Sequence, residues 1–294
     1  MRIRSPQFTV AVPVWNDMRE VVGNLERTAE VIPPGIGRVA LIDNHSPWQH
    51  NSEMLREFAS SMPHVDVYQP SRPVTISEGL NYALMTSSTP FFVPMDDDTR
   101  LVNFDPEHII RTMCGYAKIG ILSPEYDGTS VFGDDLYLAN PYREDRYPYK
   151  DLQLREIPPE GYLYGACMVM RKSDLKNLGS HPFGEPGAYG FHDILITEKL
   201  RLQGLKMVID ERTIAHHVPI TISDPEISAW KKECREGRTR MPFNEWKQLH
   251  IDGSPMKHPW LKAKDVATTR FYNERVNGAF RRRRSASKFQ LLNT

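Results

Sequence analysis

The strongest constraint on the fold is an alternation of apolar runs and helix-like segments along residues 8–95. The apolar runs are rich in β-branched residues and lie at 8–15, 38–44, 65–69 and 90–95. The segments between them repeat apolar residues at helical spacing, at 16–32, 52–62 and 77–87. This alternation predicts a mostly parallel α/β sheet with right-handed crossovers. Such sheets bind ligands beyond the carboxyl ends of their strands, so the residues that follow each strand are the candidates for a site.

The pattern changes after residue 120, where periodicity is weak and Tyr, Pro, Gly and Asp are frequent. We interpret 123–151 as a long loop or a meander of short strands. Beyond it we expect a strand and a short helix within 161–179, a helix at 191–204, strands at 205–210 and 212–217, and helices near 224–235 and 264–280. These changes divide the chain into parts at 1–120, 121–220 and 221–294.

Composition and charge give few clues to a partner. The 294 residues include 37 Lys plus Arg and 37 Asp plus Glu, so the net charge is zero. The three cysteines are far apart, which fits reduced thiols in a cytoplasmic protein better than a disulfide framework or a zinc site. The N-terminal apolar run is interpreted as a strand rather than a signal peptide. No apolar stretch approaches the roughly 20 residues of a transmembrane segment.

Three consecutive aspartates, Asp96, Asp97 and Asp98, follow the apolar run at 90–95. Adjacent carboxylates repel one another unless a cation lies between them, and Mg²⁺ and Mn²⁺ prefer oxygen ligands. In extended geometry Asp96 and Asp98 point one way and Asp97 the other, so two carboxylates can reach one ion. A histidine at 216 or 217 is a possible third ligand. The alternatives are a solvated acidic turn and a structural histidine.

Seven motifs follow one another in order along roughly residues 7–218. They are VAVPVWND, ALIDNHS, GLNYAL, FFVPMDDDTRL, GACMVMRKSDL, FHDILITEKLRLQGLKMVID and IAHH. This set resembles the nucleotide-sugar glycosyltransferases of the GT-A fold, most closely the family 2 type. The resemblance implies a Rossmann-like, mostly parallel central sheet flanked by helices. It also implies a nucleotide-sugar-binding half at 1–120, an acceptor and catalytic half at 121–220, and a C-terminal helical extension with a basic tail at 221–294.

The resemblance further implies ligands and the residues that bind them. The cofactors would be Mn²⁺ or Mg²⁺ and a nucleoside-diphosphate sugar donor, with a UDP-sugar favoured. Nucleotide-binding roles fall on Pro13, Val14, Trp15, Asp43, Asn44, Asn81, Asp96 and Asp97. Metal-binding roles fall on Asp98, Asp96, His217 and His216, with His217 preferred over His216. From the residues alone, Asp43 also fits an Asx turn with Asn44, and Asn81 also fits an amide on a helix surface.

In the family, the catalytic base belongs to an acidic pair at the start of a helix. Here the pair reads His192-Asp193, so the resemblance makes Asp193 the candidate base of an inverting reaction. The alternative for Asp193 is an acid that stabilises the helix dipole. His192 departs from the family pattern, and it either contacts the acceptor or caps the helix. Glu185, in a Gly/Pro-rich loop, is a second possible base.

The acceptor stays open between a glycan, a lipid-linked glycan and a modified DNA base. The run Arg281–Arg284 suits the phosphates of nucleic acid or an anionic membrane surface, although a solvated tail is the simpler explanation. A nucleotidyltransferase is disfavoured, because residues 13–20 lack its Gly-rich loop. The alternative function is a non-catalytic protein that binds sugar nucleotides or nucleic acid on a degenerate GT-A fold. His192 supports that alternative, whereas the intact Asp96, Asp98 and Asp193 argue against it.

Overall fold

The computed structural model describes residues 6–72, 74–126, 153–157, 163, 165–184, 192–217, 220, 224–235, 243 and 245–247. Its strands are β1 (Phe8–Val14), β2 (Gly37–Asp43), β3 (Val65–Tyr68), β4 (Phe91–Pro94), β5 (Thr99–Asn103), β6 (Ile119–Tyr126), β7 (Leu154–Glu156), β8 (Val169–Arg171) and β9 (Lys206–His217). Its helices are α1 (Met18–Val31), α2 (Asn51–Ser61), α3 (Ile76–Thr86), α4 (Pro106–Gly115), α6 (Lys172–Lys176), α7 (His192–Leu202) and α8 (Pro225–Arg235).

The described strands form one sheet in the order β3-β2-β1-β4-β8-β6-β9-β5, with β7 paired to β9. The four strands from β3 to β4 are mutually parallel, as the alternation along residues 8–95 predicts. β8 is antiparallel to both β4 and β6, so β4 and β6 run in the same direction. β9 is parallel to β6, whereas β5 and β7 are antiparallel to β9. The sheet is therefore parallel in its N-terminal half and mixed in the remainder.

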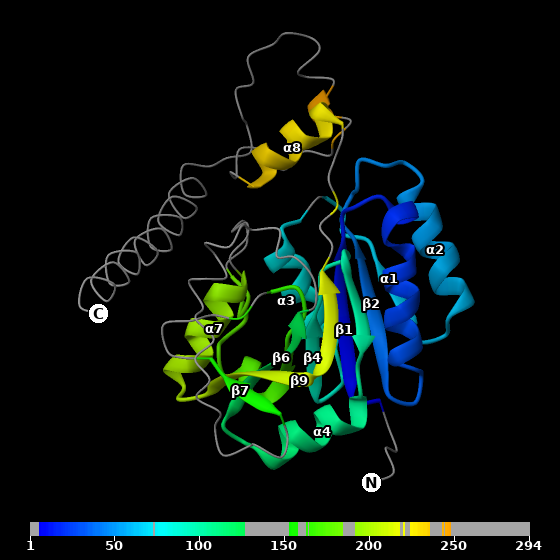
Figure 1. Cartoon of the computed structure of the whole chain (residues 1–294). Coiled ribbons are helices and arrows are strands. Elements are labelled where there is room, and N and C mark those ends of the chain that lie inside the picture. Colours follow the sequence, from blue (N-terminus) through cyan, green and yellow to red (C-terminus); the bar gives the residue numbers. More distant parts are fainter. Residues whose placement is uncertain are drawn as a thin grey trace, which may run out of the picture.

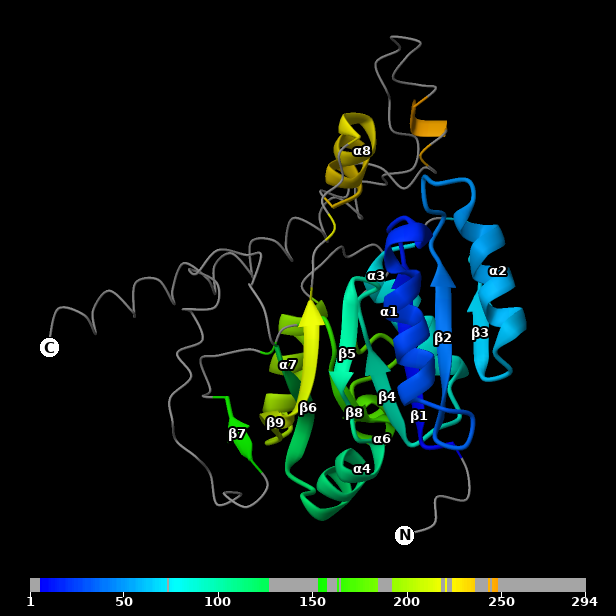
Figure 2. The same cartoon turned by 45° about the vertical axis from the view of Figure 1, so that its right-hand side comes forward.

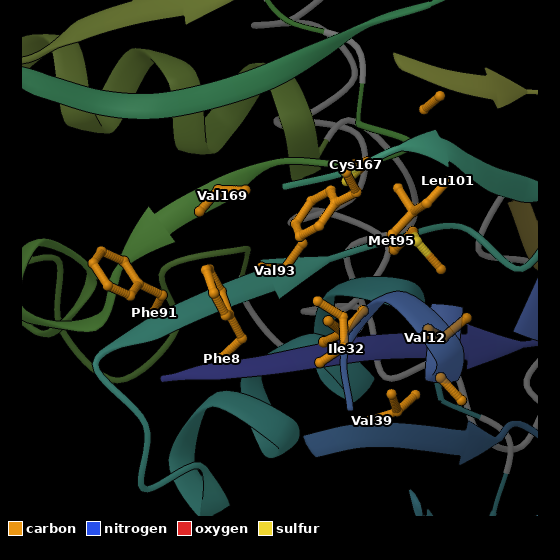
Figure 3. Close-up of a cluster of buried hydrophobic side chains, with 14 of the residues drawn as sticks. Phe8, Val12, Ile32, Val39, Phe91, Val93, Met95, Leu101, Cys167 and Val169 are labelled. Carbon is orange, nitrogen blue, oxygen red and sulfur yellow. The ribbon is translucent and has the colours of Figure 1, made fainter. Parts of the chain in front are cut away.

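Helices pack on both faces of this sheet (Figures 1 and 2). Each face has its own apolar core, because successive side chains of a strand point to opposite sides. Val10 and Val12 of β1 join a core with α1, α2 and α4, and Ala11 joins a second core with α3, α6 and α7. Figure 3 shows Phe8, Val12 and Val93 in the first of these cores. Every residue of β1 is buried, which explains its uninterrupted apolar sequence.

Most predicted elements are present with boundaries shifted by one or two residues. Asp17 caps α1 by accepting a hydrogen bond from the Arg19 backbone N–H. The strands predicted at 205–210 and 212–217 are one strand, β9, whose pairing with β6 shifts register after Asp210. The prediction missed β5, α4 and β6. β6 contains a glycine and a proline, and β5 has only five residues, three of them exposed.

The C-terminal extension contributes α8, which lies beyond the carboxyl ends of β1 and β2 (Figure 1). Ile227, Trp230, Phe243 and Trp246 form a small apolar cluster there, and it packs against two tryptophans of the loops that follow β1 and β2. The helix predicted at 264–280 and the run Arg281–Arg284 lie outside the described residues. Among the described residues, no helix combines the length and apolarity needed to span a membrane.

Candidate active site

The aspartates follow β4 in a tight turn that leads into β5. The Thr99 N–H donates to the Asp96 carbonyl at 3.1 Å, which closes the turn, and the Asp96 N–H donates to the Ala166 carbonyl at 3.0 Å. β5 then pairs with β9 so that Thr99 lies opposite His217. The pairing of these two strands therefore carries a residue from the end of β9 to the end of β4, at the edge of the sheet where ligands bind.

Asp96, Asp98 and His217 form a group that could hold a metal ion. Each offers one ligand atom, and these atoms lie within 4.8 Å of one another. His217 Nε2 is 3.1 Å from Asp98 Oδ1. His216 is not in this group, because the neighbouring residue of a strand points to the other face of the sheet.

The Asp97 side chain points away from this group, toward the loop that follows β1. Its Oδ2 accepts hydrogen bonds from the backbone N–H groups of Trp15 and Asn16, each at 2.8 Å. Its Oδ1 accepts from the Asn16 side-chain amide at 2.7 Å. The predicted division of the triplet, with Asp97 opposed to its neighbours, is present although the segment is a turn. The contacts of Asp97 are those of a residue that fixes the loop rather than one exposed to a nucleotide.

The surroundings of this group shift the pKa values of Asp96 and His217. Burial, followed by the charge of Asp98 and smaller contributions from Asp97 and Asp193, raises the pKa of Asp96 to about 7. Burial disfavours the charged form of His217, but the hydrogen bond and charge of Asp98 outweigh it and raise the His217 pKa. A protonated Asp96 carboxyl group and a protonated His217 imidazole must each lose a proton to bind a cation, so cation binding by this group depends on pH.

Replacing Asp96 by asparagine is expected to stabilise the metal-free protein at pH 8. The raised pKa means that the folded protein loses stability from this group as pH rises from about 4 through 7, and asparagine removes that loss. In EDTA, the melting temperature of Asp96→Asn should exceed that of the wild type at pH 8, and the difference should shrink toward pH 5. Each 1 kcal/mol corresponds to about 2–4 °C in a chain of roughly this size. A variant that melts below the wild type at pH 8 would contradict the assigned repulsion.

The donor set of this group could hold a divalent cation. Mg²⁺ demands oxygen ligands in near-ideal octahedral geometry, whereas an imidazole nitrogen is an accepted ligand of softer divalent ions. Asp96 and Asp98 supply carboxylate oxygens and His217 supplies a nitrogen. Three protein ligands at the edge of a sheet would leave further coordination positions of such an ion for other ligands.

Asp43, at the end of β2, is a buried carboxylate in which one oxygen accepts no hydrogen bond from the described residues. Asp43 is 2% exposed, and its Oδ2 accepts from Ser52 Oγ at 2.6 Å and from Gln69 Nε2 at 2.9 Å. Its Oδ1 is buried and has no hydrogen-bond partner among the described residues. A buried carboxylate oxygen without a donor is costly, so this atom is suited to accept an N–H from a ligand. The predicted Asx turn with Asn44 does not account for that oxygen.

The side-chain amides of Asn44 and Asn81, both predicted to bind the nucleotide, form hydrogen bonds with the protein backbone. The Asn44 side chain exchanges hydrogen bonds with the backbone of Val74, donating at 2.7 Å and accepting at 2.8 Å. The Asn81 side chain donates to the Gly184 carbonyl at 2.9 Å and accepts from the Phe183 N–H at 3.2 Å. Both amides are almost fully buried. They hold loops in place around the site, and Asn81 is not the helix-surface amide of the alternative reading.

The other predicted residues of the β1 region differ in exposure. Pro13 and Val14 are buried within β1, and Trp15 is half-buried at its end. Trp15 meets Trp230 of α8 edge to face, with ring centroids 5.3 Å apart. Of these three side chains, only Trp15 has surface available to line a pocket.

Asp193 begins α7 beside the segment that supports Asp96. A Cβ placed on Gly165 would lie 2.9 Å from the Asp193 Cβ and 3.0 Å from His192 Nε2, so α7 packs directly on the backbone there. The adjacent Ala166 carbonyl receives the Asp96 N–H. Gly165 and Ala166 thus connect Asp193 to Asp96. His192 is 7% exposed, burial lowers its pKa, and its Nδ1 has no partner among the described residues.

Replacing Gly165 by alanine is expected to displace the start of α7. The added methyl group would overlap Asp193, and overpacking of this kind costs about 1–3 kcal/mol. The melting temperature and kcat should both fall. Gly23→Ala in α1 is the matched control, because nothing lies within 4 Å of its added Cβ and alanine favours a helix by about 0.5–1 kcal/mol. Equal melting temperatures for Gly165→Ala and the wild type would show that α7 is not in close contact at this point.

Lys231, whose Nζ donates to Asn16 Oδ1 at 3.1 Å, was not predicted from the sequence, whereas Asn16 and Gly165 lie within the motifs VAVPVWND and GACMVMRKSDL. Asn16 follows a predicted strand, so its position was a usable signal. Lys231 lies on a polar helix far along the chain, and no local pattern connects it with the aspartates. Glu185, the second candidate base, lies outside the described residues.

Comparisons with known proteins support the fold. No protein-family model and no curated protein sequence matches the chain. The crystal structure of GalNAc-T7 with UDP, GalNAc and Mn²⁺ is similar, with a TM-score of 0.56 and 13% identity over 84% of this chain and 54% of that chain. The mannosyltransferase PcManGT from Pyrobaculum calidifontis, in complex with GDP-Man and Mn²⁺, has a TM-score of 0.54 and 15% identity over 98% and 81% of the two chains.

A third similar structure is S. aureus TarS 1-349 in complex with UDP-GlcNAc, with a TM-score of 0.52 and 15% identity over 76% of this chain and 61% of that chain. The chain thus spans about half of the matched GalNAc-T7 chain and somewhat more of TarS. At these identities the likeness concerns the fold. Together with the sheet order and the flanking helices, it shows that this chain has the GT-A fold of nucleotide-sugar glycosyltransferases.

Proposed function

We propose that the protein is a metal-dependent, inverting glycosyltransferase that moves a sugar from a nucleoside-diphosphate sugar to an acceptor hydroxyl. The observation that carries this proposal is the grouping of Asp96, Asp98 and His217 at the ligand-binding edge of a GT-A sheet. Asp193 lies close enough for its charge to raise the pKa of Asp96. Three side chains that could hold a cation therefore lie close to a separate carboxylate, on a fold whose solved examples include complexes with UDP or GDP-Man and Mn²⁺.

The three ligands would bind Mn²⁺ in preference to Mg²⁺. The bound cation would supply charge neutralisation for the leaving diphosphate. The protein contributes preorganisation, because Asp97 fixes the turn that carries both carboxylates through three hydrogen bonds to Trp15 and Asn16. A fixed turn avoids reorganisation when the sugar–phosphate bond breaks.

Asp193 is the proposed general base. The acceptor oxygen attacks the anomeric carbon on the face opposite the diphosphate, and the bond to the diphosphate breaks with its electron pair leaving on the phosphate oxygen. The acceptor proton passes to the Asp193 carboxylate. One displacement from the opposite face inverts the anomeric centre. A product with retained configuration, measured by NMR of the anomeric proton, would exclude this role for Asp193.

The environment of Asp43 supports a UDP-sugar over a GDP-sugar. Oδ2 of Asp43 already accepts two hydrogen bonds, whereas Oδ1 accepts none from the described residues and can take one from a ligand. One acceptor matches the single N3–H of uracil, whereas the adjacent N1–H and N2–H groups of guanine call for both carboxylate oxygens. Binding of UDP at least about tenfold tighter than GDP, in the presence of Mn²⁺, is the expected result. A preference for GDP would show that Asp43 does not contact the base in this way.

Donor turnover tests the proposal against a non-catalytic binding protein. The full chain is incubated with a UDP-sugar and Mn²⁺, and released UDP is measured with and without EDTA. We expect slow release to water that stops in EDTA and in the Asp193→Asn variant. Tight UDP binding with no release under any condition, acceptor glycans included, would instead favour the non-catalytic function.

A further inference from the structure

Helix α8 places a buried lysine, Lys231, next to the loop after β1 that forms hydrogen bonds with Asp97. Lys231 is 6% exposed, although lysine is among the residues least often buried. The helix is anchored by Trp230, which is fully buried against Trp15 and Phe243. Figure 1 shows α8 beyond the carboxyl end of β9, the strand that ends at His217. The lysine is therefore held at this position by the packing of its own helix.

The Lys231 ammonium group contacts an amide oxygen and two tryptophan rings. Lys231 Nζ donates to Asn16 Oδ1 at 3.1 Å. It also lies 5.0 Å from the ring centroid of Trp15 and 5.6 Å from that of Trp48. Two aromatic faces and an amide oxygen offset part of the cost of removing the ammonium from water. This arrangement orients Lys231 toward Asn16.

Asn16 connects Lys231 to the central aspartate of the triplet. While its Oδ1 accepts from Lys231, its Nδ2 donates to Asp97 Oδ1 at 2.7 Å. The Lys231 ammonium group next to Asn16 Oδ1 fixes the orientation of the Asn16 amide, because a reversed amide would direct its N–H groups at the ammonium group. The same orientation is the one that donates to Asp97. The contact is thus a chain of two hydrogen bonds from α8 to the turn.

Asp97 lies between Asp96 and Asp98 in the chain, so the hydrogen bonds of Asp97 to Trp15 and Asn16 fix the positions of these two neighbouring carboxylates. We propose that Lys231 is a positioning residue for the metal site, acting through Asn16 and Asp97 without touching the ion. This inference rests on the proposed function, since it concerns the same cation site. If Lys231 has this role, the C-terminal extension helps to form the donor site through helix α8.

The test measures Mn²⁺ affinity rather than turnover. Free Mn²⁺ is followed by electron paramagnetic resonance during titration of the full chain, with and without UDP. We expect Lys231→Met to weaken Mn²⁺ binding by about tenfold, within the roughly 10–100-fold range for partners that support metal ligands. Lys231→Arg should recover most of the affinity. Lys232→Met, at the next and exposed position of α8, is the matched control and should bind as the wild type does.

A double-mutant cycle separates a connected path from a general loss of stability. If Lys231 acts through Asn16, the variant with both Lys231→Met and Asn16→Ser should lose little more affinity than the weaker-binding single variant. Additive losses would overturn the path through Asn16. Folding is checked by melting in EDTA, and Asn16→Ser keeps the test decisive if Lys231→Met unfolds.

The outcomes for this inference and for the proposed function differ. A wild-type protein that takes up no Mn²⁺, even with UDP, would remove the metal-dependent function and this inference with it. A wild-type protein that binds Mn²⁺, together with a folded Lys231→Met variant of equal affinity, would remove only the role of Lys231.

Discussion

Replacing Asp193 by asparagine is expected to lower kcat by about 10²–10⁴-fold while the affinity for UDP and Mn²⁺ stays unchanged. Asparagine has nearly the same shape, so the close packing of α7 on Gly165 is retained. A carboxamide cannot accept the acceptor proton at neutral pH, and only the chemical step is lost. The measurements are steady-state turnover and isothermal titration with UDP in the presence of Mn²⁺.

The alternative role of Asp193, as an acid at a helix N-terminus, predicts something different. It would cost about 0.3–1 kcal/mol of stability and leave turnover nearly intact. Glu198→Gln in the same helix is the control, because it neutralises a half-exposed carboxylate, paired with Arg201 at 3.3 Å, while keeping its shape. Loss of donor binding with retained turnover in Asp193→Asn would mean that the assignments of base and metal ligand are exchanged.

Replacing Asp98 by alanine is expected to abolish metal-dependent donor binding. Removing a direct ligand should exceed the roughly 10–100-fold loss that follows removal of a supporting partner. It also leaves His217 without the carboxylate 3.1 Å away. Titration of Mn²⁺ in the presence of UDP measures the effect directly.

The two adjacent histidines provide the matched control for the metal site. His217→Ala should weaken Mn²⁺ binding, and His216→Ala should leave it unchanged, since only His217 joins the two aspartates. The reverse result would mean that the pairing of β5 with β9 differs by one residue from the register described here.

The first half of the fold could be predicted because its signals are local. Buried parallel strands such as β1 and β4 are continuous apolar runs, and the helices between them have regular apolar spacing. The position of Asp96 and Asp98 at the sheet edge follows from the same reasoning. β5 and β6 escaped prediction because one has mostly exposed residues and the other contains Gly120 and Pro124.

The remaining parts of the site depend on contacts between distant segments. The choice between His216 and His217 depends on the register of β5 with β9, which no local pattern reveals. The role of Asp97 depends on contacts with the loop after β1, some 80 residues earlier. The closeness of Lys231 to Asn16 depends on how α8 packs on two tryptophans. Residue type indicated the chemistry, and tertiary packing decided which side chains take part.

The most direct test of the account is a melting-temperature screen of UDP-, GDP-, dTDP- and CMP-sugars, each with Mn²⁺, Mg²⁺ or EDTA. A ligand that binds only the folded protein stabilises it by about 2.7 kcal/mol at 100 times its Kd. We predict that a UDP-sugar with Mn²⁺ gives the largest rise in melting temperature and that EDTA abolishes this rise. No rise with any nucleotide sugar, or an equal rise in EDTA, would contradict a metal-dependent donor site at Asp96, Asp98 and His217.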